Sequence, residues 1–293
     1  MNAVLTKKLT MNYSRKAALD KCTLTIPRGS VAALVGPNGA GKTTLLEILT
    51  GLIQASSGSV QLLDEFLPGS RGALRRVAFV AQNSKLYPSL SVDSLIRLAS
   101  AMNPFFDGGL AKSRLRTLGV PLERRLGKLS GGQQAQVALT LAIARRPELL
   151  ILDEPLSNLD PLARQEFLGL LMEQVATSGT TVIFSSHSLV ELERVADYLI
   201  LIVDGHIQIA GSLEEIIAHH RVVMCAPSEL DGQDDVEVIH RQLGVRFGGH
   251  LVRIRSGDAL SKFNGRSAAL EEISLGYLRR AEDIRLLEEV GTQ

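Results

Sequence analysis

The chain is 293 residues long, which suggests one large domain or two. Hydrophobic residues make up 45% and charged residues 22%, a composition typical of a globular protein that excludes disorder of the whole chain. Because 32 Lys and Arg residues balance 31 Asp and Glu residues, the net charge of +1 argues against a general nucleic-acid binder.

Apolar runs alternate with helix-like segments from the N-terminus to about residue 222. This alternation predicts an α/β fold with a mostly parallel sheet and helices on both faces. The segment from about residue 84 to 130 has prolines and glycines between helical stretches and indicates a helical insertion. The predicted strands are Val31–Val35, Val77–Ala81, Leu149–Leu152 and Thr181–Ser185, and the predicted helices are Lys42–Leu49, Gln133–Arg145 and Leu162–Thr177.

The composition changes after about Arg221. A polar stretch precedes two short apolar runs, Val236–Ile239 and Leu251–Ile254, which we interpret as strands. A helical pattern follows over Leu270–Val290. We therefore divide the chain into a domain at 1–222, with its helical part at about 84–130, and a small α+β extension at 223–293.

The cysteines and the hydropathy pattern indicate the cellular compartment in which the protein is expected. Cys22 and Cys225 form no CxxC motif, so they indicate neither a zinc site nor a disulfide framework. No apolar run approaches the ~20 residues of a membrane span, and the N-terminus lacks the apolar core of a signal peptide. We expect an intracellular protein that reaches a membrane only through a partner.

A glycine-rich loop follows the first predicted strand and begins a helix. It matches the pattern G-x-x-x-x-G-K-[ST], in which glycines let backbone N–H groups surround phosphate oxygens. The helix N-terminus adds a favourable partial positive charge. We expect Lys42 to reach the β- and γ-phosphates of a nucleotide and the Thr43 hydroxyl to bind Mg²⁺. The loop residues expected at the nucleotide are Gly36, Pro37, Asn38, Gly39, Ala40, Gly41, Lys42, Thr43 and Thr44.

Polar residues also follow the other three predicted strands. Asp153 and Glu154 end the run LLIL, an arrangement that holds Mg²⁺ in nucleotide hydrolases. Gln82 and His187 follow the second and fourth strands. If the strands are parallel neighbours, these side chains converge with the glycine-rich loop at one edge of the sheet. A lone Gln or His in such a place is otherwise a polar cap.

The pentapeptide Leu129-Ser-Gly-Gly-Gln133 stands 20 residues before Asp153. With the glycine-rich loop and the ILDEP run, it resembles the signature of ATP-binding cassette (ABC) ATPases over roughly residues 5–222. The resemblance implies a P-loop fold with an N-terminal antiparallel β region, ATP and Mg²⁺ as ligands, and ATP hydrolysis. Gln134 and Gln136 stand where a basic residue is more usual, a change that we expect to alter a surface contact.

The resemblance also implies individual roles. Tyr13 would stack on adenine, and Gln82 would touch both Mg²⁺ and the attacking water. Glu154 would polarise that water, His187 would contact the γ-phosphate, and Asp160 lies in the loop that passes between subunits. The signature residues Ser130, Gly131, Gly132 and Gln133 would contact the ATP held by an opposite subunit. Two copies, or this chain and a related one, would therefore close on two ATP molecules.

The most favoured interpretation is the ATPase subunit of an ABC transporter of the bacterial drug and antibiotic export kind, cytoplasmic and peripheral on the inner face of the membrane. Its partner would be a separate transmembrane permease that docks near Gln82 and the helical insertion, and no nucleic acid is expected. The alternative is a non-transport ABC ATPase that acts on nucleic acid or the ribosome. A third interpretation is a regulatory ATP-binding module in which residues 223–293 act as a sensor.

Overall fold

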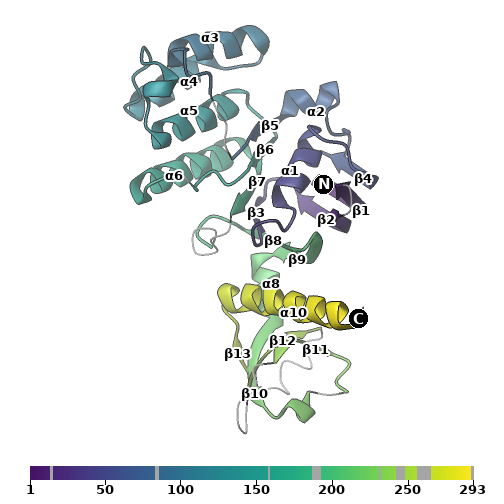
Figure 1. Ribbon diagram of the computed structural model, residues 1–293. Helices are drawn as coiled ribbons and strands as arrows, with labels where there is room; N and C mark the ends of the chain where they lie inside the picture. The colour runs from purple at the N-terminus through teal and green to yellow at the C-terminus, as the bar shows by residue number, and fades with distance from the viewer. Residues whose placement is uncertain are drawn as a thin grey trace.

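A computed structural model describes residues 1–13, 16–82, 86–157, 159–186, 193–230, 232–241, 248–255 and 265–291. Its centre is a six-stranded sheet with the order β5-β6-β7-β3-β8-β9. Neighbours from β5 to β8 pair in parallel, and only β9 runs antiparallel to β8 (Figure 1). The strands are β3 (Val31–Val35), β5 (Val77–Val80), β6 (Leu149–Leu152), β7 (Thr181–Ser186), β8 (Tyr198–Val203) and β9 (His206–Ser212).

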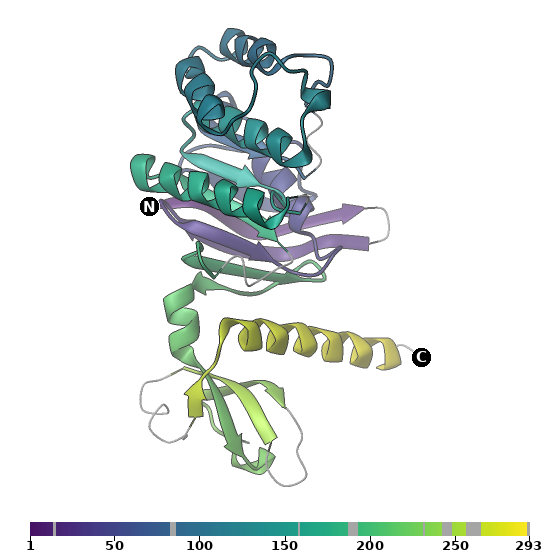
Figure 2. The same cartoon turned by 90° about the vertical axis from the view of Figure 1, so that its left-hand side faces the viewer.

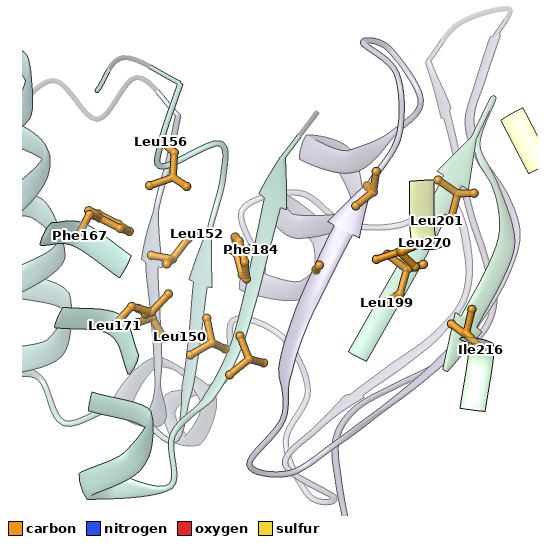
Figure 3. Close-up of a cluster of buried hydrophobic side chains, with 14 of the residues drawn as sticks. Leu150, Leu152, Leu156, Phe167, Leu171, Phe184, Leu199, Leu201, Ile216 and Leu270 are labelled. Atoms are coloured by element: carbon orange, nitrogen blue, oxygen red, sulfur yellow. The ribbon is translucent and has the colours of Figure 1, made fainter. Parts of the chain in front are cut away.

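The sheet is apolar on both faces, which explains why its strands are continuous apolar runs rather than alternating ones. On one face, Leu150, Leu152 and Phe184 pack against Phe167 and Leu171 of helix α6 (Pro161–Ser178), as Figure 3 shows. Alternate residues of the same strands point to the other face and contact helix α1 (Lys42–Thr50). The predicted α/β architecture with a parallel sheet is confirmed, and the four predicted strands differ from the observed ones by at most one residue.

A second, antiparallel sheet covers the α1 face. It has the order β2-β1-β4, built from β1 (Asn2–Tyr13), β2 (Lys16–Pro27) and β4 (Ser57–Leu62). The β1–β2 register shifts between Thr6 and Leu9, where Lys8 and Lys21 both have a positive φ of 47°. Such bulges move side chains to the other face and break the two-residue period. The antiparallel region that the resemblance implied is therefore present, although its strands have no clean alternating pattern.

Helices α3 (Val92–Met102), α4 (Gly108–Thr117) and α5 (Gly131–Ala144) form a separate helical layer at the top of Figure 1. They share one apolar cluster, to which α5 contributes Val137 and Ala144. The helical part thus extends past the predicted insertion into α5. The 3₁₀ turn η1 (Leu126–Lys128) leads into α5, and the short helix α2 (Arg71–Arg76) precedes β5.

The C-terminal part has a four-stranded antiparallel sheet of order β11-β12-β10-β13. Its strand β10 begins at His220, two residues before the end of the first domain that we place at residue 222. The boundary between the two domains therefore remains a proposal. Helix α10 lies between this sheet and the central six-stranded sheet (Figures 1 and 2). The elements are α8 (Leu213–His219), β10 (His220–Cys225), η2 (Pro227–Glu229), β11 (Val236–Arg241), β12 (Gly248–Ile254), β13 (Gly265–Ser267) and α10 (Leu270–Gly291).

Helix α10 shares an apolar cluster with the central sheet. Leu270 lies beside Leu199 and Leu201 of β8 in Figure 3. His220, at the end of α8, uses both ring nitrogens: Nδ1 contacts the Ile216 carbonyl oxygen at 2.6 Å and Nε2 contacts the Tyr277 hydroxyl at 3.1 Å. Burial lowers the pKa of His220 and raises the pKa of Tyr277 to about 12. None of the helices in the described ranges is long and apolar enough to cross a membrane.

Candidate active site

The glycine-rich loop between β3 and α1 is enclosed by neighbouring backbone. A Cβ on Gly36 would lie 2.1 Å from the carbonyl oxygen of Ile202, so a side chain there would have to displace β8. Gly41 has a φ of 104°, and its Cβ would lie 2.4 Å from the carbonyl oxygen of Ala18. Gly36 therefore needs to be glycine for space, and Gly41 for both space and conformation. The loop therefore has a fixed shape, with Pro37, Asn38 and Gly39 exposed on its outer side.

Lys42 is the first residue of α1, and its ammonium group lies inside this loop. Nζ donates hydrogen bonds to the carbonyl oxygens of Gly36 at 2.7 Å and Pro37 at 3.1 Å. It is also 3.5 Å from Oε1 of Glu154, with Lys42 only 6% and Glu154 only 9% exposed. A buried cation is thus held beside a buried anion at the place where a phosphate would enter.

Asp153 is fixed by two hydroxyl groups, one from helix α1 and one from strand β7. Thr43 Oγ1 donates to Oδ2 at 2.9 Å, and Ser185 Oγ of β7 donates to Oδ1 at 2.6 Å. The same Ser185 hydroxyl accepts a hydrogen bond from the backbone N–H of Glu154 at 2.8 Å. Ser185 was not among the residues expected at the site. Its one available signal is a hydroxyl in a fully buried strand that also holds Thr181 and Ser186.

Glu154 has a φ of 47°, an uncommon conformation for a residue with a side chain. This conformation turns the chain sharply after β6, and Ser157 Oγ stabilises the turn by donating to the Glu154 carbonyl oxygen at 3.0 Å. The backbone of Asp153 donates to Val80 of β5, which anchors the turn to the neighbouring strand. The strain is therefore held by contacts on both sides of the residue.

Oxygen ligands for a hard cation meet at this point. The Thr43 hydroxyl and the Asp153 carboxylate are 2.9 Å apart. In the described part of the chain, no group of three or more His, Cys, Asp or Glu residues could hold a metal by itself. One carboxylate and one hydroxyl suit Mg²⁺, which binds few protein groups and takes its other ligands from water and phosphates. The donor set therefore fits Mg²⁺ that arrives with a nucleotide.

Not all predicted site residues reach this cluster to the same extent. Gln82 is exposed two residues after Val80, on the β5 side of Asp153. Tyr13 is exposed at the end of β1, where it pairs with Lys16. That end of the β1–β2 hairpin lies near the loop, because Ala18 contacts Gly41. His187 lies outside the described residues.

The signature segment starts helix α5. Ser130 Oγ accepts from the Gln133 backbone N–H at 3.2 Å, and Gln133 Oε1 accepts from the Ser130 N–H at 3.3 Å. This capping box fixes the helix start. A Cβ on Gly132 would lie 3.3 Å from Ala163 of α6. Ser130 and Gly131 are exposed, so the first turn of α5 is open on the surface.

Helices α5 and α6 are linked by a hydrogen bond between their second turns. Gln136 is 4% exposed and donates from Nε2 to Glu166 Oε2 at 2.6 Å. The expectation that this residue makes only a surface contact is therefore wrong: its amide lies in the α5–α6 interface. Asp160 caps α6 by accepting from the Ala163 N–H at 3.0 Å and is exposed. The same two helices thus present Ser130 and Asp160.

The turn between β8 and β9 forms a backbone hydrogen bond to the glycine-rich loop. The Gly205 N–H donates to the Ala40 carbonyl oxygen at 3.0 Å, and the Gly205 carbonyl oxygen accepts from Asp20 N–H at 2.9 Å and Cys22 Sγ at 2.9 Å. A Cβ on Gly205 would lie 2.9 Å from the Ala18 carbonyl oxygen. Burial raises the pKa of the Cys22 thiol, so it remains a hydrogen-bond donor. Sequence reasoning missed this contact because its partners are more than 160 residues apart.

Comparisons with known proteins agree with this geometry. A family model described as ABC transporter matches residues 19–157. The lantibiotic transport ATP-binding protein SrtF of Streptococcus pyogenes is 34% identical over 69% of this chain and 87% of its own length. The sn-glycerol-3-phosphate import ATP-binding protein UgpC of Jannaschia sp. is 36% identical over 69% of this chain and 59% of its own.

The chain belongs to the ABC transporter family.

Solved structures support the same assignment. An ATP-binding subunit of an ABC transporter superposes with a TM-score of 0.66 at 27% identity, over 74% of this chain and 92% of the other. A dimeric ATP-binding cassette with bound ADP and Pi has a TM-score of 0.64 at 25% identity, over 72% and 98%. This chain is therefore an ATP-binding subunit of an ABC transporter and an ATPase, which favours the transporter prediction over the nucleic-acid or ribosome alternative.

Proposed function

We propose that this ABC ATPase is the energy-supplying subunit of an exporter and works on the inner face of the cell membrane with a separate permease. The observation that carries the enzymatic part is the pair of contacts at the carboxyl edge of the sheet, Lys42 with Glu154 and Thr43 with Asp153. The export direction is supported by the likeness to a lantibiotic transport protein.

In the proposed reaction, ATP phosphates replace Glu154 as the partner of Lys42. The ammonium then neutralises charge on the phosphates, and Glu154 is released to accept a proton from the attacking water. The fixed turn at Glu154 keeps its carboxylate at the edge of the loop. His187 would contact the γ-phosphate, Gln82 would orient the water, and Tyr13 would stack on adenine.

Mg²⁺ is proposed to be held by Thr43 and Asp153, with Gln82 beside them. When bound, it would neutralise charge on the phosphate oxygens. The protein's own contribution is the Ser185 hydroxyl, which keeps one Asp153 oxygen oriented and leaves the other toward Thr43. A second subunit would supply its exposed Ser130, Gly131, Gly132 and Gln133 to the same ATP, with Asp160 at the contact between subunits.

A groove beside β5 is the proposed docking site for the permease. It measures about 630 Å³ and lies between α2 with β5 on one side and α3 with α5 on the other. Three exposed apolar side chains line it, Leu74, Met102 and Phe105. Exposed apolar surface of this kind marks an interaction site. Leu86, at the start of the predicted helical insertion, also lines the groove.

The test is purification of the Glu154→Gln variant with ATP from native cells in detergent. This variant should hold the closed dimer and retain a multi-span membrane polypeptide. Recovery of ribosomes or DNA without such a polypeptide would contradict the transporter assignment.

Direction is tested in proteoliposomes whose ATPase subunits face outward. After ATP is added, an exporter accumulates cargo in the lumen. Lantibiotics, the class in the name of the relative SrtF, are the first cargo to try. Release of preloaded cargo from the lumen instead would contradict the export direction and leave the ATPase assignment intact.

A further inference from the structure

A cavity lies where the cassette joins the C-terminal sheet. Helix α8 connects β9 to β10 and so links the two parts of the molecule (Figure 2). The cavity measures about 270 Å³ and lies between β9 with α8 on one side and the end of β12 on the other. We call it the junction cavity. None of its described lining residues belongs to the nucleotide site.

Arg253 of β12 brings to this cavity a positive charge that no carboxylate neutralises. In the described part of the chain it forms no ion pair. Its side chain contacts the Tyr277 hydroxyl, which stays uncharged because burial raises the pKa of Tyr277 to about 12. Burial also lowers the pKa of the nearby His220, and the charge of Arg253 lowers it further, so this imidazole is neutral as well.

The other charged side chains of the lining do not cancel the charge of Arg253. Arg255 shares the Glu237 carboxylate with Arg280, at distances of 3.3 Å and 2.7 Å, so one anion serves two cations. Glu215 is the one acidic side chain among the described lining residues. Two arginines against one carboxylate leave the cavity with an excess of positive charge, and the exposed His219 adds to it when protonated.

Apolar side chains form the part of the wall that comes from the cassette. Ile209 of β9 and Ile216 of α8 are 7% and 5% exposed, and both belong to the buried cluster of the central sheet. A ligand in the cavity can therefore cover apolar atoms on this side and place a charged group at Arg253. Sites for drug-sized ligands measure about 300–1,000 Å³, so the cavity fits a smaller molecule.

We propose that the junction cavity binds a small organic anion whose carboxylate or phosphate pairs with Arg253 and whose apolar body contacts Ile209 and Ile216. A planar guanidinium can donate two parallel hydrogen bonds to either kind of anion. The site is separate from the ATP site and does not depend on the proposals for export and for permease docking. Because the ligand contacts β9, α8 and β12 together, it stabilises the position of the C-terminal sheet against the cassette.

The experiment uses nuclear magnetic resonance of the full chain labelled with carbon-13 at its isoleucine methyl groups. Magnesium and ADP are present to fill the nucleotide site. The probes are 4-methylpentanoate, isobutyl phosphate and the uncharged 4-methylpentanamide, and Ile209→Val and Ile216→Val assign the two signals. We expect saturable shifts of both signals with at least one anion, at a dissociation constant of about 1 mM or below, and binding of the amide that is weaker by about tenfold or more.

Two variants test the cavity by different means. Arg253→Gln removes the charge and should weaken anion binding by about tenfold or more. Its matched control is Arg266→Gln, because Arg266 is an exposed arginine of the same sheet that is paired with Glu272 and does not line the cavity. Ala210→Phe fills the cavity without a change of charge and should abolish the shifts. Arg253 and Ala210 are both exposed, so these variants should fold, and unchanged ADP binding checks this.

The outcomes distinguish the head group from the site itself. The anion that binds more tightly identifies the head group as a carboxylate or a phosphate. Equal affinity for the amide, or an Arg253→Gln affinity within about threefold of that of Arg266→Gln, would overturn recognition of an anion by Arg253. Absence of a saturable shift at Ile209 and Ile216 with either anion, at about twentyfold the expected dissociation constant, would overturn the site.

Discussion

Ser185→Ala should destabilise this ATPase more than an ordinary buried serine substitution does. The hydroxyl is fully buried, donates to the Asp153 carboxylate at 2.6 Å, and accepts from the Glu154 N–H at 2.8 Å. Loss of a hydrogen bond to a charged group costs about 1.5–3 kcal/mol, and an amide left without a partner adds about 1–3 kcal/mol. Because the two contacts share one atom and are not additive, we expect a loss of about 3 kcal/mol in the free energy of unfolding.

The measurement is urea unfolding followed by far-ultraviolet circular dichroism, because the chain contains no tryptophan. In thermal unfolding followed by the same signal, the melting temperature should fall by about 6–12 °C, at about 2–4 °C per kcal/mol for a protein of this size. Hydrolysis should also slow, since the same change loosens Asp153 and Glu154 together.

Ser30→Ala is the matched control. Ser30 is also buried, but its hydroxyl makes one neutral hydrogen bond, to the Pro27 carbonyl oxygen at 2.8 Å, and should cost about 1 kcal/mol. If Ser185→Ala loses no more stability than Ser30→Ala, then the Ser185 hydroxyl does not hold the two carboxylate residues as argued.

Three further predictions concern the site and the extension. Glu154→Gln should keep ATP binding and abolish turnover; phosphate release at the normal rate would contradict the assignment. Lys42→Ala should lose ATP binding, and an unchanged nucleotide dissociation constant would refute the loop assignment. Arg266 holds the pKa of Glu272 at about 2, below its usual value, so stability from this contact is present above about pH 4.5 and lost as pH falls toward 2. The stability difference between wild type and Glu272→Gln should therefore shrink over that range in acid titrations, and a difference independent of pH would count against the ion pair.

The nucleotide edge of the fold could be predicted from sequence because its signals are local. Val31–Val35 and Leu149–Leu152 are buried on both faces, so their apolar runs have sharp limits. The residues that follow them then meet by the geometry of parallel strands. The same geometry gave no information on Ser185, since nothing in the sequence distinguishes its hydroxyl from those of Thr181 and Ser186 in the same buried strand.

Other features depend on contacts between distant segments. The β1–β2 hairpin lacks a clean two-residue period because bulges at Lys8 and Lys21 shift its register. Gln136 looks like a surface residue in the sequence, yet α6 covers it. The roles of Tyr13 and of His187 stay predictions.

The α10–β8 contact has a consequence for how the extension is studied. Leu270, Ile273 and Tyr277 belong to the same buried cluster as Leu199 and Leu201 of the cassette sheet. A protein cut at residue 222 would expose that apolar strip to water and would also divide β10. Loss of activity in such a fragment would report on solubility and folding as much as on regulation. Substitutions on the outer face of the C-terminal sheet, with α10 left in place, are the cleaner way to ask what the extension does.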